Sequence, residues 1–272
     1  MKLKIGISPC PNDTFIFDGV YNKTIDLKGY EFEFILEDVQ TLNELALKGE
    51  IDILKISYAH YFNVMGDYIL LRCGSALGKG VGPLLIAKSD IPLSEINNKT
   101  IAIPGIHTTA NFLFSFAFPN GLHKSPMVFS EIENAVINGT KDVGVIIHEN
   151  RFTYQEKGLC KLMDLGNYWE DKTQLPIPLG GIAIKRNLAN SIQQEINTII
   201  YESLMLSRKK YPALGDFIIS NAQEMSHDVM KQHIDLYVND YSLNIGIDGQ
   251  KAVEKMQSTL GNQSTLPLFI EI

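Results

Sequence analysis

Short apolar runs alternate along the chain with longer segments in which apolar residues recur every three or four positions. The runs have the length and composition of buried strands, and the longer segments have the period of amphipathic helices. We predict strands over 3–8, 31–37, 51–57, 68–73, 83–88, 100–104, 126–130, 143–148, 160–165 and 180–185. We predict helices over 12–21, 39–48, 58–65, 108–118, 131–138, 151–157, 188–210, 226–240 and 248–260. This alternation indicates an α/β protein with largely parallel sheets.

Two of the strand-like segments stand where the chain would cross between two lobes. They span 84–88 and 176–185, and a polar turn follows the first. If both segments link lobes, residues 89–185 form an inserted second lobe, and residues 1–88 with 186–272 form the first. We then expect a ligand cleft between the lobes, because domain interfaces are favoured positions for small-molecule sites.

Length, charge and cysteine content indicate which partners and which cellular compartment to expect. The 272 residues suffice for about two domains, and a net charge of -7 without a large basic cluster makes a nucleic-acid partner unexpected. The three cysteines lack CxxC spacing, which is typical of reduced thiols in a cytosolic protein. We see neither a secretory leader nor an apolar stretch of about 20 residues. We therefore expect a cytoplasmic protein with no membrane partner, and the oligomeric state stays open.

Polar residues follow several predicted strands at the point where a helix begins. After the first strand, prolines fix the backbone, and Asn12 or Asp13 can cap the next helix. Such a turn is compatible with a purely structural role and with ligand contact. After the third strand, Ser57 is a candidate cap, and Lys55 lies on the same face. Because Lys55 interrupts an apolar run, its ammonium must either extend out of the core or meet a negative partner.

A pair of threonines, Thr108 and Thr109, opens the very apolar helix predicted over 108–118. A helix start offers free N–H groups and a positive dipole end, which suit a carboxylate or a phosphate. One threonine is enough for a cap, so the second favours a ligand. The neighbouring His107 either reaches the same ligand or is exposed.

His148 ends the apolar run Val143–Ile147, and Arg151 follows shortly after. Open α/β sheets bind ligands at the carboxyl ends of their strands. Imidazole is also the side chain best suited to proton transfer near neutral pH. His148 is therefore a candidate general base, with a structural histidine as the alternative. Whether Arg151 contacts the ligand stays open.

Other motifs do not meet the requirements of known sites. The glycine-rich segment 74–80 lacks Walker spacing and leads into a strand rather than a helix. We find no His, Cys and carboxylate set with the spacing of metal ligands and no GxSxG elbow. We therefore expect neither a metal nor an organic cofactor.

Three segments resemble the 1,4-dihydroxy-6-naphthoate synthase family, which acts in the futalosine route to menaquinone. They are Ser8–Phe15, Gly144–Tyr154 and Leu175–Gly181, and the resemblance extends over nearly the whole chain up to residue 186. One departure is Asn150, where we expect glycine.

The resemblance implies a two-lobed fold like that of the type II periplasmic binding proteins. It also implies a lyase that converts cyclic dehypoxanthinyl futalosine, a small-molecule carboxylate, to 1,4-dihydroxy-6-naphthoate. His148 matches the family's general base. The stretches Lys55-Ile56-Ser57 and Thr108-Thr109 match its substrate contacts.

Two alternatives share the fold. One is the chorismate dehydratase of the same pathway, and the other is a non-catalytic module that binds a small anion, because a fold does not determine function. The absence of an export signal and of a helix-turn-helix domain makes the binding module less expected. The segment that follows His148, Arg151-Phe152-Thr153-Tyr154, favours the naphthoate synthase over the dehydratase.

Overall fold

The computed structural model of the protein describes residues 1–222 and 226–271. Contacts within the chain group it into two compact units, which are described separately below. Unit 1 consists of Met1–Gly78 and Pro178–Ile272, and unit 2 is Lys79–Ile177.

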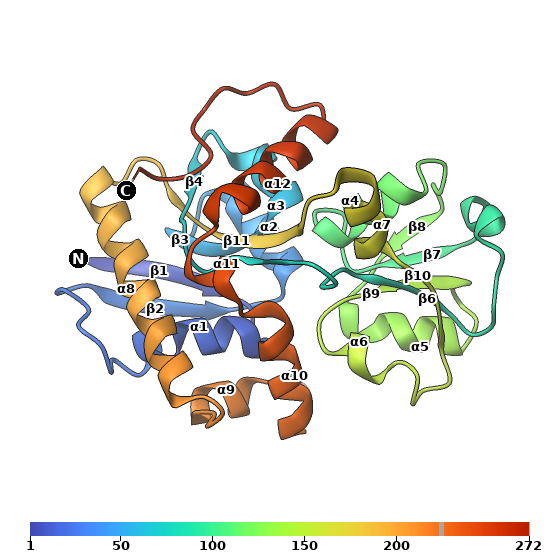
Figure 1. The fold of residues 1–272 in the computed structure, drawn as a ribbon, viewed down its shortest axis with the longest axis horizontal. Coiled ribbons are helices and arrows are strands. Elements are labelled where there is room, and N and C mark those ends of the chain that lie inside the picture. The colour runs from blue at the N-terminus through green and yellow to red at the C-terminus, as the bar shows by residue number, and fades with distance from the viewer. Residues whose placement is uncertain (223–225, 272) are drawn as a thin grey trace. The chain divides into compact units, whose positions relative to one another are not determined.

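The described residues of unit 1 form a six-stranded sheet with helices on it (Figure 1). The strand order is β2-β1-β3-β11-β4, and β5 pairs with β11. Its strands are β1 (Lys2–Ile7), β2 (Glu31–Leu36), β3 (Ile53–Ser57), β4 (Tyr68–Leu70), β5 (Ala76–Gly78) and β11 (Ile177–Lys185). Its helices are α1 (Pro11–Tyr21), α2 (Val39–Lys48), α3 (Tyr58–Val64), α8 (Asn190–Lys210), α9 (Asp216–Asn221), α10 (His227–Tyr237), α11 (Asp240–Leu243) and α12 (Gly246–Thr259).

Unit 2 is built on a five-stranded sheet with the order β10-β6-β9-β7-β8. Its strands are β6 (Leu84–Ala87), β7 (Ile101–Ile103), β8 (Lys124–Pro126), β9 (Val143–Ile146) and β10 (Cys160–Asp164). Its helices are α4 (Thr109–Ala117), α5 (Ile132–Ile137), α6 (Asn150–Thr153) and α7 (Leu165–Thr173), with 3-10 turns η1 (Leu93–Asn98) and η2 (Phe129–Glu131).

The boundaries of the units differ from the predicted lobes, 1–88 with 186–272 and 89–185. Strand β6 lies in the sheet of unit 2, and β11 lies in the sheet of unit 1. Unit 2 therefore begins and ends earlier in the chain than the predicted second lobe. Residues 223–225 and 272 of the predicted first lobe lie outside the described residues.

Both sheets are mixed, so the prediction of largely parallel sheets is wrong. Strand β1 is parallel to β2 and β3, and β7 is parallel to β8 and β9, as expected for strand–helix alternation. Strand β11 is antiparallel to β3 and β4, and β6 is antiparallel to β9 and β10. Strands β6 and β11 are not connected to these partners by a single helical crossover. The preference of βαβ units for parallel pairing therefore does not apply to these two strands.

The elements that escaped prediction include β5, α7, α9 and η1, and the helix predicted over 226–240 reaches only the first residue of α11. The sequence of α7 mixes polar and aromatic residues over only nine positions, which gives a weak period. Its start signal is Asp164, whose carboxylate accepts the N–H groups of Gly166 and Asn167 as a helix cap. The strand predicted over 160–165 includes this cap, because apolar residues stand on both sides of Asp164, at Met163 and Leu165.

Helix α1 is held in the core of unit 1 along almost its entire length. All residues from Pro11 to Val20 are buried, and the helix lies beside α8 (Figure 1). The hydroxyl of Ser203 in α8 donates to Ile16 O at 2.7 Å and accepts Gly19 N–H at 3.0 Å. This tight contact fixes the helix that follows the first strand of the chain.

The three cysteines are free thiols, in agreement with their spacing in the sequence. Burial raises the pKa of the Cys73 thiol to about 12, which keeps it protonated and unreactive. Within the described ranges we find no helix with the length and apolar character that a bilayer crossing requires.

Two glycine backbones make a close contact in unit 2. A Cβ atom on Gly82 would lie 2.3 Å from Gly166 Cα, and one on Gly166 would lie 2.3 Å from Ile177 Cδ1. Beside this contact, Leu165 N–H donates to Pro83 O at 3.0 Å. The first turn of α7 is therefore packed directly on the backbone that leads into β6.

We expect Gly166→Ala to destabilise unit 2 by about 2–3 kcal/mol, because the added methyl group must displace backbone atoms. Trp169, the sole tryptophan of the chain, is fully buried in α7. Its fluorescence during urea denaturation reports the unfolding of this unit.

Gly158→Asn is the matched control for that measurement. Gly158 has a left-handed backbone (φ 74°) and no other group within 4 Å of an added Cβ, and asparagine tolerates this conformation. Its effect should stay below about 1 kcal/mol. Equal unfolding midpoints for the two variants would contradict the importance of the Gly82–Gly166 contact.

Candidate functional site

The lysine inside the third strand meets a buried carboxylate. Lys55 Nζ lies 2.8 Å from Asp13 Oδ1, and the two side chains are only 7% and 1% exposed. The ammonium also donates to Gly74 O at 3.3 Å. Of the two arrangements open from the sequence, the structure has the ion pair. Removal of one partner would leave an uncompensated charge in the core, which costs about 3–5 kcal/mol.

Asp13 is the centre of a hydrogen-bonded cluster. Its Oδ1 accepts a hydrogen bond from Asn12 Nδ2 at 2.8 Å in addition to the contact with Lys55. Its Oδ2 accepts from Ser8 Oγ at 2.7 Å and from Ser8 N–H at 3.3 Å. The predicted capping role is wrong, because Asn12 and Asp13 lie within the first turn of α1 and Cys10 stands at the cap position. The helix dipole favours a carboxylate in this first turn.

Ser57 stands at the cap position of α3, as predicted, but its side chain makes no capping bond. Instead its N–H donates to Asn43 Oδ1, and its Oγ accepts from Asn43 Nδ2, both at 3.0 Å. Lys55 and Ser57 lie on the same face of β3. The side chain of Ile56 between them is fully buried on the other face.

The glycine pair of β11 lies directly against this part of β3. A Cβ on Gly180 would lie 3.0 Å from Ile56 O and 3.3 Å from Lys55 Cε. A Cβ on Gly181 would lie 2.9 Å from the Tyr58 ring. Glycines at both positions therefore let β11 pack closely on Ile56 and Tyr58, which is a structural reason for the glycines of the motif at 175–181.

In unit 2, His148 adopts a left-handed backbone with φ 56°. Strand β9 ends at Ile146, so the strand predicted over 143–148 is two residues too long, and His148 lies in the turn that precedes α6. Its ring packs edge-on against Phe129, with centroids 4.9 Å apart. A non-glycine residue in this region is uncommon, and such strain clusters at functional sites.

Arg151 stabilises the turn around His148 through hydrogen bonds and an ion pair. Its Nη2 lies 2.9 Å from both Asp164 Oδ2 and Gly80 O, and its Nη1 donates to Gly82 O. The guanidinium thus joins α6 to the loop before β6, which assigns Arg151 a structural role. Asn150, where we expected glycine, begins α6 in ordinary helical conformation, so the position places no demand for glycine on the backbone.

The threonine pair divides between a cap and a buried helical position. Thr108 Oγ1 accepts Asn111 N–H at 3.2 Å and donates to Gly105 O at 2.8 Å, so Thr108 is the cap of α4. Thr109 is the first residue of α4 and is buried. His107 next to the pair is partly buried.

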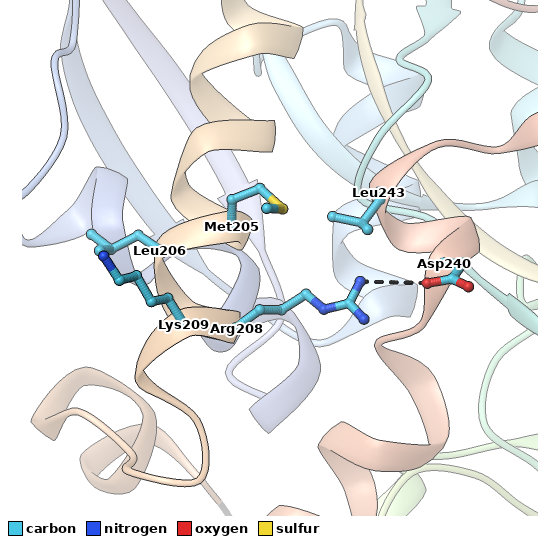
Figure 2. Close-up of a pocket in the computed structure, with 6 residues that line it drawn as sticks. All are labelled: Met205, Leu206, Arg208, Lys209, Asp240 and Leu243. Atoms are coloured by element: carbon cyan, nitrogen blue, oxygen red, sulfur yellow. Dashed lines mark ion pairs between the residues drawn. The ribbon is translucent and has the colours of Figure 1, made fainter.

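Two cavities of unit 1 involve none of the predicted site residues. The first, of about 560 Å³, is lined by Met205, Leu206, Arg208, Lys209, Asp240 and Leu243. Figure 2 shows the Arg208 side chain extending from α8 toward Asp240, at an N–O distance of 3.6 Å. Both groups are exposed, so this pair adds little stability.

The second cavity has about 300 Å³ and lies beside α1 and α8. Burial raises the pKa of the Asp18 carboxyl at its edge, and the charge of Lys210 opposes this shift. Its other lining residues are Phe15, Ser207, Ala213, Leu214, Gly215 and Ile218.

The polar cluster around Lys55 was only partly visible in the sequence. Lys55 and Ser57 were singled out there, whereas the roles of Ser8, Asp13 and Asn43 were not. One usable signal was an acidic residue at the start of a helix whose next turn reads Phe15-Ile16-Phe17. A carboxylate in such an apolar segment needs a cation.

The fold matches that of periplasmic binding proteins. The solved alkanesulfonate-binding protein from Xanthomonas axonopodis, bound to MOPS, superposes with a TM-score of 0.70, covering 98% of this chain and 96% of that one. The sequence identity is 12%, so this likeness concerns the fold alone. A Candida albicans protein described as having the generic periplasmic binding protein fold gives a TM-score of 0.65 at 12% identity, covering 100% and 98% of the two chains.

Sequence comparison defines the family. The family model described as menaquinone biosynthesis matches residues 3–261. The chain is 38% identical to the 1,4-dihydroxy-6-naphthoate synthase of Thermus thermophilus, covering 98% of this chain and 99% of that protein. It is 37% identical to the enzyme of that name from Streptomyces coelicolor, covering 97% and 95%. The chain therefore belongs to the menaquinone biosynthesis family and, within it, to the 1,4-dihydroxy-6-naphthoate synthases.

Proposed function

We propose that this enzyme is a carbon–carbon lyase that converts cyclic dehypoxanthinyl futalosine to 1,4-dihydroxy-6-naphthoate, with His148 as the general base. The names of the two relatives support the product. The observation that carries the role of His148 is its strained position just beyond the end of β9. Residues held in sparsely populated backbone conformations cluster at active sites and ligand contacts.

The chemistry of the reaction matches what one histidine can supply. Cleavage of a carbon–carbon bond that creates an aromatic ring has a large intrinsic driving force. It needs a positioned base to start it, and a general base typically contributes about 10²–10⁴-fold. The edge-on contact with Phe129 restricts the orientation of the imidazole, which favours proton removal from one position of the substrate.

Substrate binding is assigned to the two stretches that match the family's contacts. In unit 1, Lys55 and Ser57 offer side-chain donors, and Ile56 contributes only its backbone because its side chain is buried. In unit 2, Thr109 and the first N–H groups of α4 suit the substrate carboxylate. Thr108 supports this arrangement as the cap that holds the helix start in place.

The test of the proposed function is a direct assay. The purified protein is mixed with cyclic dehypoxanthinyl futalosine, and the absorbance and mass of 1,4-dihydroxy-6-naphthoate are followed. Unchanged substrate would support a binding module instead. Turnover of chorismate without turnover of the cyclic futalosine would support the dehydratase.

We expect His148→Asn to lower the single-turnover rate by about 10²–10⁴-fold, because the general base is lost. Asparagine also tolerates the left-handed backbone, so the turn before α6 should persist. Calorimetry should give a substrate Kd close to that of the wild type.

His123→Asn is the matched control, since His123 is exposed and lies in the same unit. This variant should turn over substrate at the wild-type rate. A rate for His148→Asn within a few-fold of the control would remove His148 as the base.

Thr109→Val should raise the substrate Kd about 10-fold, because a hydrogen bond to a charged group is lost. The Kd is measured by calorimetry in the His148→Asn background, where the substrate is not consumed. Thr108→Val should in addition lower unfolding stability by about 1 kcal/mol through loss of the cap. An unchanged Kd for Thr109→Val would rule out the assignment of this side chain to the carboxylate.

A further inference from the structure

In the Lys55–Asp13 pair, the ammonium has a hydrogen-bond donor left, whereas the carboxylate has no acceptor position left. A carboxylate offers about four acceptor positions, and Asp13 receives Lys55 and Asn12 on Oδ1 and two groups of Ser8 on Oδ2. An ammonium has three donors, and Lys55 uses two of them, on Asp13 and on Gly74 O. The pair can therefore donate one more hydrogen bond but has no position left to accept one.

Because its acceptor positions are occupied, Asp13 is not suited to act as a general base. A general base needs a lone pair that can reach a substrate proton, and the lone pairs of Asp13 already receive hydrogen bonds from the protein. The carboxylate is also buried and is held in the first turn of the fully buried helix α1. Asp13 is therefore suited to hold another group in place.

The group that it holds is the Lys55 ammonium. A lysine side chain is a flexible four-carbon chain, so its ammonium samples many positions when it is free. Here Asp13 and Gly74 fix its Nζ from two directions, and the backbone of Gly180 is so near that an added Cβ would lie 3.3 Å from its Cε. The direction of the third N–H bond is thereby set before the substrate arrives.

The charge of the pair indicates which substrate atom this N–H bond meets. The opposite charges of Lys55 and Asp13 lie 2.8 Å apart, so together they carry no net charge. A carboxylate brought to this pair would bring an uncompensated negative charge beside Asp13, which is costly in buried surroundings. A neutral carbonyl or hydroxyl oxygen carries no such cost.

From these observations we infer that Asp13 is a positioning residue, which orients the Lys55 ammonium so that Lys55 donates one hydrogen bond to a neutral oxygen of the substrate. The inference rests on the proposed function for the identity of the substrate. It assigns the substrate carboxylate elsewhere, in keeping with the role proposed for Thr109.

The first experiment is a double-mutant cycle on kcat/KM with cyclic dehypoxanthinyl futalosine, using Asp13→Asn, Lys55→Met and the double variant. Misplacement of a positioned group by about 1 Å can cost 10²-fold. We therefore expect Asp13→Asn to lower kcat/KM about 100-fold in the wild-type background. In the Lys55→Met background the same change should cost less than about 3-fold, because Asp13 acts through Lys55.

Unfolding midpoints separate positioning from simple stabilisation. Asp13→Asn leaves a buried ammonium without its counter-charge, so its midpoint should fall. The double variant removes both charges, so its midpoint should recover while its activity stays low. Recovery of activity together with the midpoint would mean that the pair only stabilises the fold, which would overturn the inference.

Asp52→Asn is the matched control for the loss of an Asp–Lys pair. Asp52 pairs with Lys185 at 3.0 Å in the same unit, but both side chains are partly exposed. This variant should keep the wild-type kcat/KM. A loss of kcat/KM comparable to that of Asp13→Asn would show that removal of any Asp–Lys pair of this sheet lowers activity, which would contradict a specific role of Asp13.

The second experiment compares cyclic dehypoxanthinyl futalosine with its methyl ester. If Lys55 donates to a neutral oxygen, Lys55→Met should lower kcat/KM by the same factor for acid and ester. A loss confined to the acid would place the carboxylate on Lys55 and overturn the inference. Additive effects of the two substitutions in the double-mutant cycle would overturn the positioning role of Asp13 and leave the proposed function intact. A wild-type protein that does not turn over the cyclic futalosine would overturn the proposed function itself.

Discussion

The ion pair between Lys55 and Asp13 is the constraint on which the candidate site of unit 1 depends. An ammonium in the middle of an apolar strand is tolerated only where a carboxylate and further hydrogen bonds meet it. That requirement fixes the turn after β1, because Ser8 and Asn12 must hold the carboxylate. It also leaves little room on β11 at Gly180, which pairs with Ser57 and where an added Cβ would lie 3.3 Å from Lys55 Cε.

Unit 2 holds its candidate base, His148, in a different way. His148 is held by a backbone conformation that costs energy, by the ring of Phe129 and by a turn that Arg151 ties to the loop before β6. That loop is itself fixed by the close contact of Gly82 with Gly166. A strained residue persists only when its surroundings determine its position from several sides, and these contacts supply that support.

The sequence was informative where a local pattern determines the structure. The α/β class, the free thiols and most helices follow from period and composition, and helix α2 spans the predicted residues 39–48. Local patterns failed where distant segments decide the outcome. The antiparallel direction of β11 depends on neighbours far away in the chain, and α7 has a period too weak to recognise.

The same distinction applies to the candidate site. Lys55 was marked because a charge interrupted an apolar run, but its partner could not be chosen without the fold. Asp13 had the position of a helix cap, and only the fold, which brings the start of α1 to Lys55 of β3, explains why it faces the lysine. A cap by one of the two threonines was expected from the sequence, since capping is a local interaction, and in the structure Thr108 is that cap.

The neutrality of the Lys55–Asp13 pair has a consequence for how the substrate first approaches the enzyme. The chain carries a net charge of -7, and such a field would repel the proposed carboxylate substrate at long range. A compensated pair in unit 1 does nothing to reverse that repulsion. The Lys55–Asp13 pair would therefore not attract the proposed substrate from a distance, and its contribution to recognition would begin only at contact distance, where ionic strength has little influence on a buried donor.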